Sequence, residues 1–535
     1  MAEYQKNKLM TYFEERKRVV LFGILVMLIT IIPYLVGFSS QGSDWRYTGF
    51  VIGVEDGNSY IAKMLSGADG DWLFRSPYSV EDQKGVIVFL PYLLLGKLSS
   101  EPAQHDQLVV LYHAFRLLSG FLVILASYDF IGFFIVKKKY QWWALILVVL
   151  GGGLGWVLVF SNLKGFFGSL PLDFISPESF GFLGILGFPH LCVARALLLW
   201  GLVYYLNRST GYLPGLFWLV MGLFQPLVTV IAWAIISIHL SLIILINKFG
   251  ADKNRNFPIE TQKLYLKKAA QAVLVSSPIV IYTAVVFLSD PYLIGWNKQN
   301  ILPSPHFLHY IIAYGIFFPF TILGLRKLFE VQPARGLLLI GWVTILPILI
   351  YAPIATQRRL VEGIWVVIVV GFLGFFQNRT EFPVYAKLLS LMAFPTTLLL
   401  MTGSITSVLN PAKPLFIPVG EVAAYQTLAS RANKNAVVLS SFETGNNLPA
   451  WVPVQVVMGH GPETINLYQI KSEVDDFFNS NPQHSECRDF FKENNIEYLF
   501  WGPSEANTWN WDPDTSGCLT KIYNQDNYSL YQVEN

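Results

Sequence analysis

The chain has 535 residues, of which 53% are hydrophobic, 15% aromatic and only 14% charged, and its net charge is +2 at pH 7. This balance excludes an ordinary soluble globular protein and predicts a polytopic membrane protein. Because Lys and Arg are spread along the chain and not gathered into one patch, nucleic acid is not an expected partner.

Apolar runs long enough to cross a bilayer predict eleven membrane-spanning helices. A span needs about 20 mostly apolar residues, or slightly fewer where turn residues flank it. The first run has no small-residue cleavage site after it and is expected to be a retained anchor, not a signal peptide. The fifth and sixth runs are separated only by Gln225 and Pro226, which predicts a hairpin broken by the proline. The runs are 19–38, 108–136, 141–160, 190–206, 212–225, 227–247, 269–289, 306–326, 336–353, 360–377 and 384–408.

The distribution of charge predicts which side of the membrane each loop occupies. With a cytoplasmic N-terminus, every loop expected in the cytoplasm contains Lys or Arg, as at 137–139, whereas most acids fall in the other loops. The apolar run at 86–98 is too short to span and is expected to lie as an interfacial helix. Residues 39–107 therefore form one long extracytoplasmic loop of a multi-pass plasma-membrane protein.

After residue 408 the composition becomes polar, which predicts a small extracytoplasmic α/β domain at 409–535, next to a transmembrane domain at 1–408. Strand-like runs lie at 435–441, 454–459 and 496–502, and helix-like runs at 465–478 and 484–494. In an extracytoplasmic compartment Cys487 and Cys518 could form a disulfide.

Two adjacent carboxylates, Glu55 and Asp56, follow the first span in the stretch GVEDGNSYIAKM. Carboxylates at this position could deprotonate an acceptor hydroxyl or hold a divalent cation. Alternatively, Asp56 could simply be the N-cap of the helix that follows. The surroundings favour a site, because nearby aromatic and basic side chains suit a sugar and a phosphate. These neighbours are Asn58, Tyr60, Lys63, Trp72, Arg75 and Tyr78.

Three cationic clusters are expected near the outer membrane face. They are His113 with Arg116 in the second span, His190 with Arg195 in the fourth, and Arg358 with Arg359 after the ninth. Ionisable groups in a span are costly and indicate function, and the planar fork of arginine suits phosphate. Each residue could instead snorkel or pair with an acid such as Glu362. Together the clusters suit an anionic lipid headgroup that enters from the bilayer.

Two further patterns have less specific interpretations. Asp173 and Glu178, in LPLDFISPESFGF, indicate either a structural loop or a metal or acceptor role. The stretch GGGLG at 151–155 falls inside an expected span, so it predicts close helix packing and not a phosphate-binding loop.

In this layout the chain resembles the membrane-embedded GT-C glycosyltransferases, which include protein O-mannosyltransferases, aminoarabinose transferases of lipid A and oligosaccharyltransferases. Glu55 and Asp56 stand where the family has its acidic motif after the first helix. FLPYLLLGKL followed by AFRLLSGFLVIL resembles the family's "PLYYLLL" and "RLxSxLxG" stretch. FETGNNLPAWVPVQVVMGHGPET, IEYLFWGPSE and TQRRLVEG look like segments of a bacterial branch. The O-mannosyltransferases usually have Asp before Glu, so the reversed order here leaves open which carboxylate is the base.

The resemblance implies an inverting transfer of a hexosyl or pentosyl group from a polyprenyl-phosphate donor to a glycan, lipid or protein acceptor on the extracytoplasmic side. Asp56 would be the base, and Glu55 would position the acceptor or a cation. Arg358, Arg359 and Arg195 would hold the donor phosphate. Further substrate contacts are expected from His190, Arg116, Tyr60, Lys63 and Arg75. A divalent cation, Mg²⁺ or Mn²⁺, is left open, with Glu55, Asp56 and Asp173 as candidate ligands.

Two other functions compete with sugar transfer. A transporter or flippase of lipid-linked saccharides also needs cations at membrane level, but transporters usually keep ionisable residues near the midplane and often contain inverted repeats. A scaffold that only displays the C-terminal domain leaves the acids and arginines without a role. The charges crowd the expected outer face and no repeat is visible, so the sequence favours the enzyme.

Overall fold

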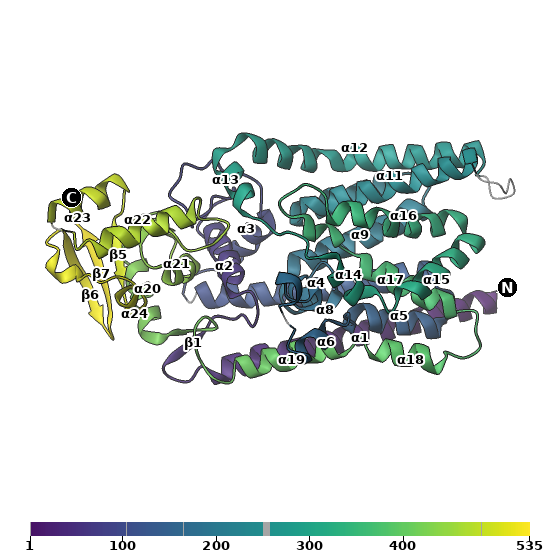
Figure 1. Cartoon of the computed structure of the whole chain (residues 1–535), viewed down its shortest axis with the longest axis horizontal. Helices are drawn as coiled ribbons and strands as arrows, with labels where there is room; N and C mark the ends of the chain where they lie inside the picture. The colour runs from purple at the N-terminus through teal and green to yellow at the C-terminus, as the bar shows by residue number, and fades with distance from the viewer. Residues whose placement is uncertain (1, 103, 164, 250–256, 483, 535) are drawn as a thin grey trace. The chain divides into compact units, whose positions relative to one another are not determined.

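The computed structural model of the chain describes residues 2–102, 104–163, 165–249, 257–482 and 484–534 (Figure 1). The chain folds into two compact units that are each built from several stretches of sequence. The first unit comprises Met1–Ile32, Phe115–Thr283 and Leu302–Gly403, and the second comprises Pro33–Ala114, Ala284–Ile301 and Ser404–Asn535. The polar C-terminal region therefore shares a unit with all of the expected first loop, whereas the sequence suggested a boundary at residue 409.

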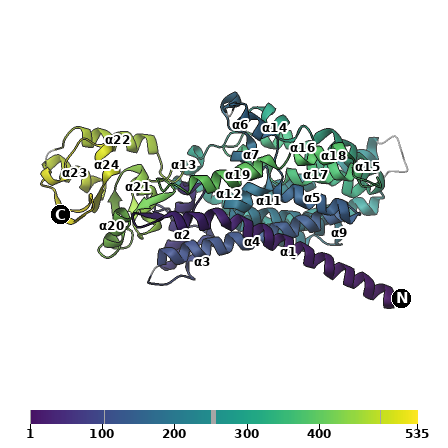
Figure 2. The same cartoon turned by 90° about the horizontal axis from the view of Figure 1, so that it is seen from below.

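Long apolar helices dominate the chain, as expected for a multi-pass membrane protein. Among the described residues, eight helices are long and apolar enough to cross a bilayer, or nine if one bent pair counts as a single span. Such helices satisfy all their backbone groups internally, which lipid demands. The first, α1, is continuous from Ala2 to Ser40 (Figure 2). The others are α4 (Gln104–Phe134), α9 (Pro189–Asn207), α11 (Pro226–Phe249), α12 (Ile259–Ser289), α16 (Pro333–Ile350), Gln357–Phe376 with α17 (Ile364–Phe376), and Val384–Ser407 with α18 (Val384–Leu391) and α19 (Pro395–Ser407). The bent pair is α14 (Phe307–Tyr314) and α15 (Phe318–Val331), at 72°.

One expected span is shorter than the sequence suggested. The run 141–160 is interrupted, because α5 (Lys138–Leu150) ends at three glycines before the short α6 (Gly155–Phe160). A Cβ on Gly153 would lie 2.6 Å from the backbone of Ala313, so glycine permits a close backbone approach here. The expectation that GGGLG lies inside a span was therefore wrong, although the close packing is present. The run 212–225 forms α10 (Tyr212–Phe224), and the next helix begins at Pro226 as predicted.

Several short elements complete the first unit. Three are short helices, η1 (Phe166–Gly168), α7 (Leu172–Ile175) and α8 (Gly181–Gly187), and the fourth, η3 (Gln357–Val361), opens the Gln357–Phe376 span. One large apolar core runs through this unit and buries Trp218, Trp342 and Trp365. The helices α15 and α17 approach closely at two glycines, where a Cβ on Gly324 would lie 1.8 Å from the carbonyl oxygen of Gly371.

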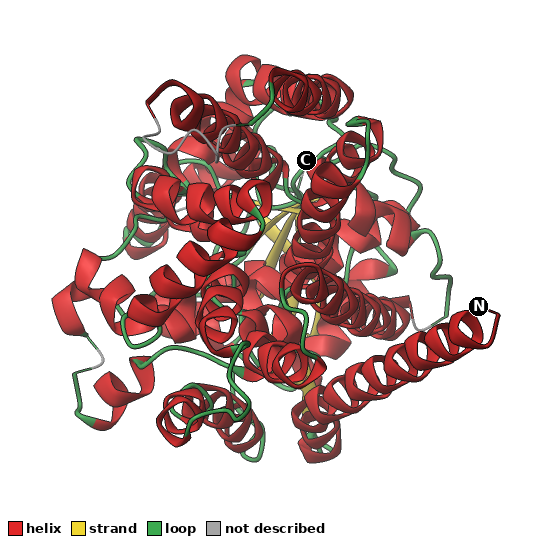
Figure 3. Cartoon of the chain, turned by 90° about the vertical axis from the view of Figure 1, so that its right-hand side faces the viewer, coloured by secondary structure: helices red, strands yellow, loops and turns green. Residues whose placement is uncertain are grey.

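The second unit contains a five-stranded sheet in the order β4-β3-β5-β7-β6 (yellow in Figure 3). Strands β4 (Gln455–Val456), β3 (Val437–Leu439) and β5 (Tyr498–Trp501) are parallel, whereas β7 (Tyr528–Val533) and β6 (Leu519–Gln525) form an antiparallel hairpin. Helices α20 (Val419–Ala429), α21 (Phe442–Asn447), α22 (Leu467–Asn479), α23 (His484–Glu493) and α24 (Pro503–Thr508) and the turns η4 (Leu448–Ala450) and η5 (Pro513–Thr515) connect them. The predicted small α/β domain is confirmed.

The first loop is tied to the C-terminal region by backbone hydrogen bonds, in a separate two-stranded sheet and at one strand of the five-stranded sheet. Strand β1 (Trp45–Tyr47) pairs antiparallel with β2 (Phe416–Pro418), and the N–H of Val456 on β4 donates to the carbonyl of Pro77 over 2.8 Å. The loop also carries α2 (Val54–Ala68) and α3 (Leu90–Gly96), and α13 (Pro291–Gln299) belongs to the same unit. Helices α2 and α3 meet at glycines, since a Cβ on Gly96 would lie 1.7 Å from the carbonyl oxygen of Met64.

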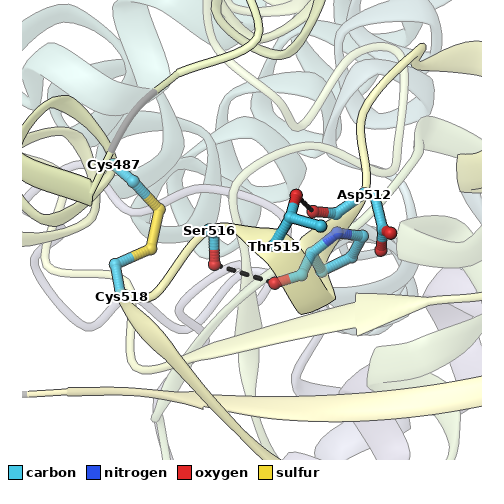
Figure 4. The surroundings of a disulfide bond; sticks show 6 residues. Cys487, Asp512, Thr515, Ser516 and Cys518 are labelled. Carbon is cyan, nitrogen blue, oxygen red and sulfur yellow. Dashed lines mark hydrogen bonds between the residues drawn. A yellow bond between two sulfur atoms is a disulfide. The ribbon is translucent and has the colours of Figure 1, made fainter.

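A disulfide joins Cys487 on α23 to Cys518 just before β6 (Figure 4). The turn beside it is closed by side-chain hydrogen bonds, in which Ser516 Oγ donates to the carbonyl of Pro513 over 2.8 Å and Thr515 Oγ1 donates to that of Asp512 over 2.9 Å. The bond therefore links the α23 region to the terminal hairpin.

Candidate functional site

Glu55 and Asp56 lie in the first turn of α2, and both side chains are exposed. The N-cap is Gly53, with φ 58° in the left-handed region that glycine tolerates. The interpretation of Asp56 as an N-cap was therefore wrong, because the helix begins two residues earlier. Acids in the first turn of a helix still interact favourably with its dipole.

Both acids contact a segment that is distant in sequence, Gly459–Thr464, which we call the GHGPET segment. The N–H of Gly461 donates to Glu55 Oε1 over 2.8 Å. The ring of His460 places Nε2 3.5 Å from Asp56 Oδ1. Two turns further along α2, Lys63 Nζ lies 2.6 Å from Glu463 Oε1. The segment thus follows one face of α2, whose residues recur every three or four positions.

Glu463 is the buried anchor of this contact. Its side chain is 4% exposed and that of Lys63 is 1% exposed. Ser59 Oγ and Ser76 Oγ each donate to a carboxylate oxygen of Glu463 over 2.6 Å. Burial alone would raise the pKa of Glu463, but the charges of Lys63 and His460 and the donated hydrogen bonds outweigh it and lower the pKa to about 2. The carboxylate is therefore ionised at neutral pH.

The structure places Lys63 inside the unit and not at a ligand-accessible surface. Besides Glu463, its ammonium contacts Ser59 and lies 4.5 Å from the ring centroid of Phe89 and 5.2 Å from that of Phe74. A direct contact of Lys63 with substrate, as the sequence suggested, would require this buried arrangement to open.

Two other predicted neighbours lie on the same unit. Tyr60 is partly buried and stacks on Tyr92 with ring centroids 4.6 Å apart. Arg75 is exposed, and its Nε donates to the carbonyl of Gln83 over 3.3 Å. Of these two side chains, Arg75 is the more exposed to solvent.

The position of α2 is fixed by a second set of contacts. Asn58 Nδ2 donates to the side-chain oxygens of Asn446 and Asn447 over 2.8 and 2.7 Å. Tyr78, fully buried, donates to the carbonyl of Asn446 over 3.1 Å. Asn446 and Asn447 end α21, which follows β3, so the sheet region holds α2 at two places.

All the predicted cations of the spans except His113 belong to the first unit. His113 belongs to the second unit, where its Nε2 lies 2.9 Å from the carbonyl oxygen of Gly49. Two of the cations in the first unit are paired with protein groups. Arg195 is 6% exposed and pairs with Glu362, and its remaining N–H groups donate to the carbonyls of Phe180, Pro177 and Glu178. This is the ion pair that the sequence left open as an alternative. Arg116 is buried and donates to Thr30 Oγ1 over 3.1 Å, whereas His190, on α9, is partly exposed.

Arg358 and Arg359 lie in η3 and are both partly exposed. Arg359 Nε is 3.8 Å from Glu178 Oε1. Arg358 Nε is buried and makes no hydrogen bond within the described part of the chain. Arg358 and Arg359 are therefore less occupied by protein groups than Arg195, whose guanidinium pairs with Glu362 and donates to three backbone carbonyls.

The candidate metal ligands Glu55, Asp56 and Asp173 do not all belong to one unit. Asp173, in α7, is buried in the first unit, where its Oδ2 accepts hydrogen bonds from the Gly155 N–H and Thr396 Oγ1. Glu55 and Asp56 belong to the second unit. No three His, Cys, Asp or Glu side chains gather in a way that could hold a metal ion among the residues that the structure describes. A cation held by Glu55 or Asp56 together with a substrate phosphate stays a prediction.

His460, Gly461 and Glu463 were not predicted as site residues, although they lie in a stretch that carries the family resemblance. They lie about 400 positions from their partners on α2, since Lys63 and Glu463 are separated by 400 residues. The available signal was a histidine between two glycines followed three residues later by an acid, directly after a strand-like run.

Comparisons with known proteins identify similar structures but no similar sequences. No protein-family model matches the chain, and no curated protein matches it significantly. An oligosaccharyltransferase of Archaeoglobus fulgidus tethered with an acceptor peptide aligns over 97% of this chain and 74% of its own, with a TM-score of 0.53 and 13% identity. The oligosaccharyltransferase AglB of that organism, with an inhibitory peptide and a dolichol-phosphate, aligns over 91% and 69%, with a TM-score of 0.50 and 11% identity.

A third similar structure is the arabinofuranosyltransferase AftD from Mycobacteria. It aligns over 96% of this chain but only 40% of its own, with a TM-score of 0.51 and 14% identity. At these identities the similarities show a common fold and nothing finer.

Proposed function

We propose that this chain, which has the fold of the GT-C glycosyltransferases, transfers a sugar from a polyprenyl-phosphate donor to an acceptor on the extracytoplasmic side of the membrane. The observation that carries the proposal is the exposed Glu55-Asp56 pair, which the GHGPET segment holds at the start of α2. The dolichol-phosphate bound to the archaeal enzyme of similar fold supports this class of donor.

Asp56 is the proposed base. Its side chain is 53% exposed, so an acceptor can reach it. The acceptor hydroxyl gives its proton to Asp56 while its oxygen forms a bond to the anomeric carbon. The bond from that carbon to the phosphate oxygen breaks, its electron pair leaves with the lipid phosphate, and the configuration inverts. A positioned carboxylate contributes roughly 10²- to 10⁴-fold as a general base. Asp56 then returns the proton to solvent.

Glu55 is the proposed positioning group for the acceptor. One of its oxygens already accepts a hydrogen bond from the Gly461 N–H, which fixes the carboxylate without occupying both oxygens. A fixed carboxylate next to the base can orient a hydroxyl or amine for attack, and orientation is a large part of catalysis in reactions between two substrates.

Arg358 and Arg359 are the proposed ligands of the donor phosphate. Their partly exposed side chains support this role, because a guanidinium binds phosphate through several parallel N–H donors. Arg195 is expected to act indirectly, since it donates to the backbone carbonyl of Glu178, whose carboxylate approaches Arg359.

The test is transfer of label from undecaprenyl phosphate that carries radioactive mannose, glucose or arabinose, with the purified full-length protein in lipid vesicles. We expect Asp56→Asn to lower transfer at least about 100-fold. The matched control is Asp526→Asn, at an exposed turn position of the same unit with φ 51°, which asparagine also tolerates, and it should transfer as wild type does.

Two results would contradict the proposal. If Asp56→Asn transfers as well as wild type, Asp56 is not the base. If wild-type protein moves the lipid-linked sugar between leaflets but transfers none to an acceptor, the flippase alternative is correct.

A further inference from the structure

We propose that His460 is a positioning residue for Asp56 and that the C-terminal region thereby completes the catalytic centre. This inference rests on the proposed function. It assigns a role in the transfer to a histidine that lies about 400 residues from the acid it contacts and that no sequence motif identified.

The ring of His460 stands between two carboxylates. Nε2 lies 3.5 Å from Oδ1 of the exposed Asp56, and Nδ1 lies 3.6 Å from Oε1 of the buried Glu463. The His460 side chain is itself 6% exposed, and its Nδ1 makes no hydrogen bond within the residues described. A nearly buried imidazole next to a fixed carboxylate presents Nε2 towards Asp56.

The backbone that carries the His460 ring is fixed by hydrogen bonds. The backbone N–H of His460 donates to Thr464 Oγ1 over 3.3 Å, and its carbonyl accepts from the N–H of Thr464 over 2.8 Å. Thr464 Oγ1 in turn donates to the carbonyl of Tyr78, whose ring lies 5.4 Å from the imidazole. Glu463, behind the ring, is held by Lys63, Ser59 and Ser76. A rigid partner of this kind restricts where Asp56 can hold a proton.

The backbone of the GHGPET segment is also anchored from α13. Gln299 Nε2 donates to the carbonyls of Pro462 and Thr464 over 3.0 and 2.6 Å, and Gln299 Oε1 accepts from the Asn466 N–H over 3.2 Å. Tyr292 donates to the carbonyl of Glu463 over 3.0 Å. The contact between His460 and Asp56 is therefore part of a fixed frame and not a chance meeting of surface side chains.

The place of His460 in the sheet supports a role at a ligand site. The GHGPET segment begins three residues after the end of β4, at the carboxyl edge of the parallel strands β4, β3 and β5. Asn446 and Asn447, which hold α2, follow β3 at the same edge. In open α/β sheets, ligands bind outside the carboxyl ends of parallel strands. Here the first turn of α2, with Glu55 and Asp56, is held at that edge.

The role predicts a specific order of activities among three substitutions. In His460→Gln the amide nitrogen can take the place of Nε2, whereas in His460→Asn it takes the place of Nδ1. Because Asp56 faces Nε2, glutamine should restore more activity than asparagine. We expect His460→Ala to lower kcat roughly 10- to 100-fold, with the KM for the donor changed less than about threefold, because misplacing a catalytic group affects the reaction step more than binding.

The experiment measures kcat and KM with the labelled undecaprenyl-phosphate sugar that wild type uses, for full-length protein and the three His460 variants. The control is His484→Ala, at an exposed histidine of α23 in the same unit, which should match wild type. Retained thermal unfolding midpoints show that the variants are folded. If His460→Ala does not fold, the comparison of Gln with Asn still decides the role.

The inference is overturned if wild type and Asp56→Asn differ in kcat while His460→Ala matches wild type, if the loss lies entirely in KM, or if asparagine restores as much as glutamine. A wild-type chain that transfers no sugar overturns the proposed function, and this inference with it.

Discussion

Replacing Lys63 by methionine tests whether the buried pair with Glu463 holds the GHGPET segment against α2. The two groups are 2.6 Å apart with side chains 1% and 4% exposed. Removing one partner of a buried pair leaves the other charge unpaired and typically costs about 3–5 kcal/mol. The lowered pKa of Glu463 gives a consistent figure: a drop from the usual 4.5 to about 2 corresponds to about 3 kcal/mol of stability at neutral pH.

The sign of the pH dependence follows from the direction of that shift. The folded state binds the proton of Glu463 less readily than the unfolded state does, so the stabilisation is complete above the unfolded pKa, about 4.5. It is lost progressively as the pH falls from there towards 2. Lys63→Met should therefore be less stable than wild type at pH 7, and the difference should shrink as the pH falls through this window.

The assay is the thermal unfolding midpoint of the purified full-length protein in detergent, for wild type, Lys63→Met, Glu463→Gln and the double variant. The double variant should be more stable than Lys63→Met, because no unpaired charge is left inside. The control is Lys434→Met, which breaks a half-exposed ion pair with Asp69 and Asp71 in the same unit and should cost less than about 1 kcal/mol. If Lys63→Met unfolds with wild type, or if the double variant is the least stable, the reasoning is refuted.

Three further predictions concern the disulfide, the phosphate ligand and metal dependence. Replacing Cys487 and Cys518 by serine should cost about 3–4 kcal/mol, since the bond closes a loop with a sequence separation of 31; an unchanged unfolding midpoint would contradict this. Arg358→Gln should raise the KM for the labelled lipid donor about tenfold, because it removes a charged donor to the phosphate. The control is Arg379→Gln, at an exposed arginine after α17, which should leave this KM unchanged. Equal KM values for both variants would exclude Arg358 as a phosphate ligand. Incubation with EDTA should leave transfer within about twofold, because the proposed step needs only a carboxylate that accepts the acceptor's proton. A loss of transfer that Mn²⁺ restores would show that a cation takes part.

The membrane-spanning helices could be predicted from the sequence because bilayer thickness fixes the length of an apolar run. The runs around 19–38 and 227–247 became long helices for that reason. The run 141–160 failed because hydropathy does not register the backbone: three glycines allow the chain to leave the helix and approach Ala313. The hairpin β6–β7 was also missed, although Asp526 and Asn527, with φ 51° and 65°, form the kind of turn that connects paired strands.

Only part of the candidate site could be predicted from the sequence. Glu55 and Asp56 stood out because two adjacent acids in the loop after the first span are unusual in an apolar chain. Their partners could not be found in the same way, because a contact between Asp56 and His460 depends on how a loop and a sheet far apart in sequence pack together. Lys63 shows the opposite error: a lysine beside two acids suggests a surface site, but its charge is used inside the fold.

The separation of 400 residues between Lys63 and Glu463 has a consequence for biosynthesis. At a synthesis rate of about 5–20 residues per second, α2 is complete roughly 20–80 s before the GHGPET segment exists. The strand pairing of Trp45–Tyr47 with Phe416–Pro418 has to wait in the same way. During this interval Asp56 lacks His460 and Lys63 lacks Glu463. A chain that stops early therefore carries the acids but no assembled centre, and competence for the proposed reaction arises only when nearly the whole polypeptide has been made.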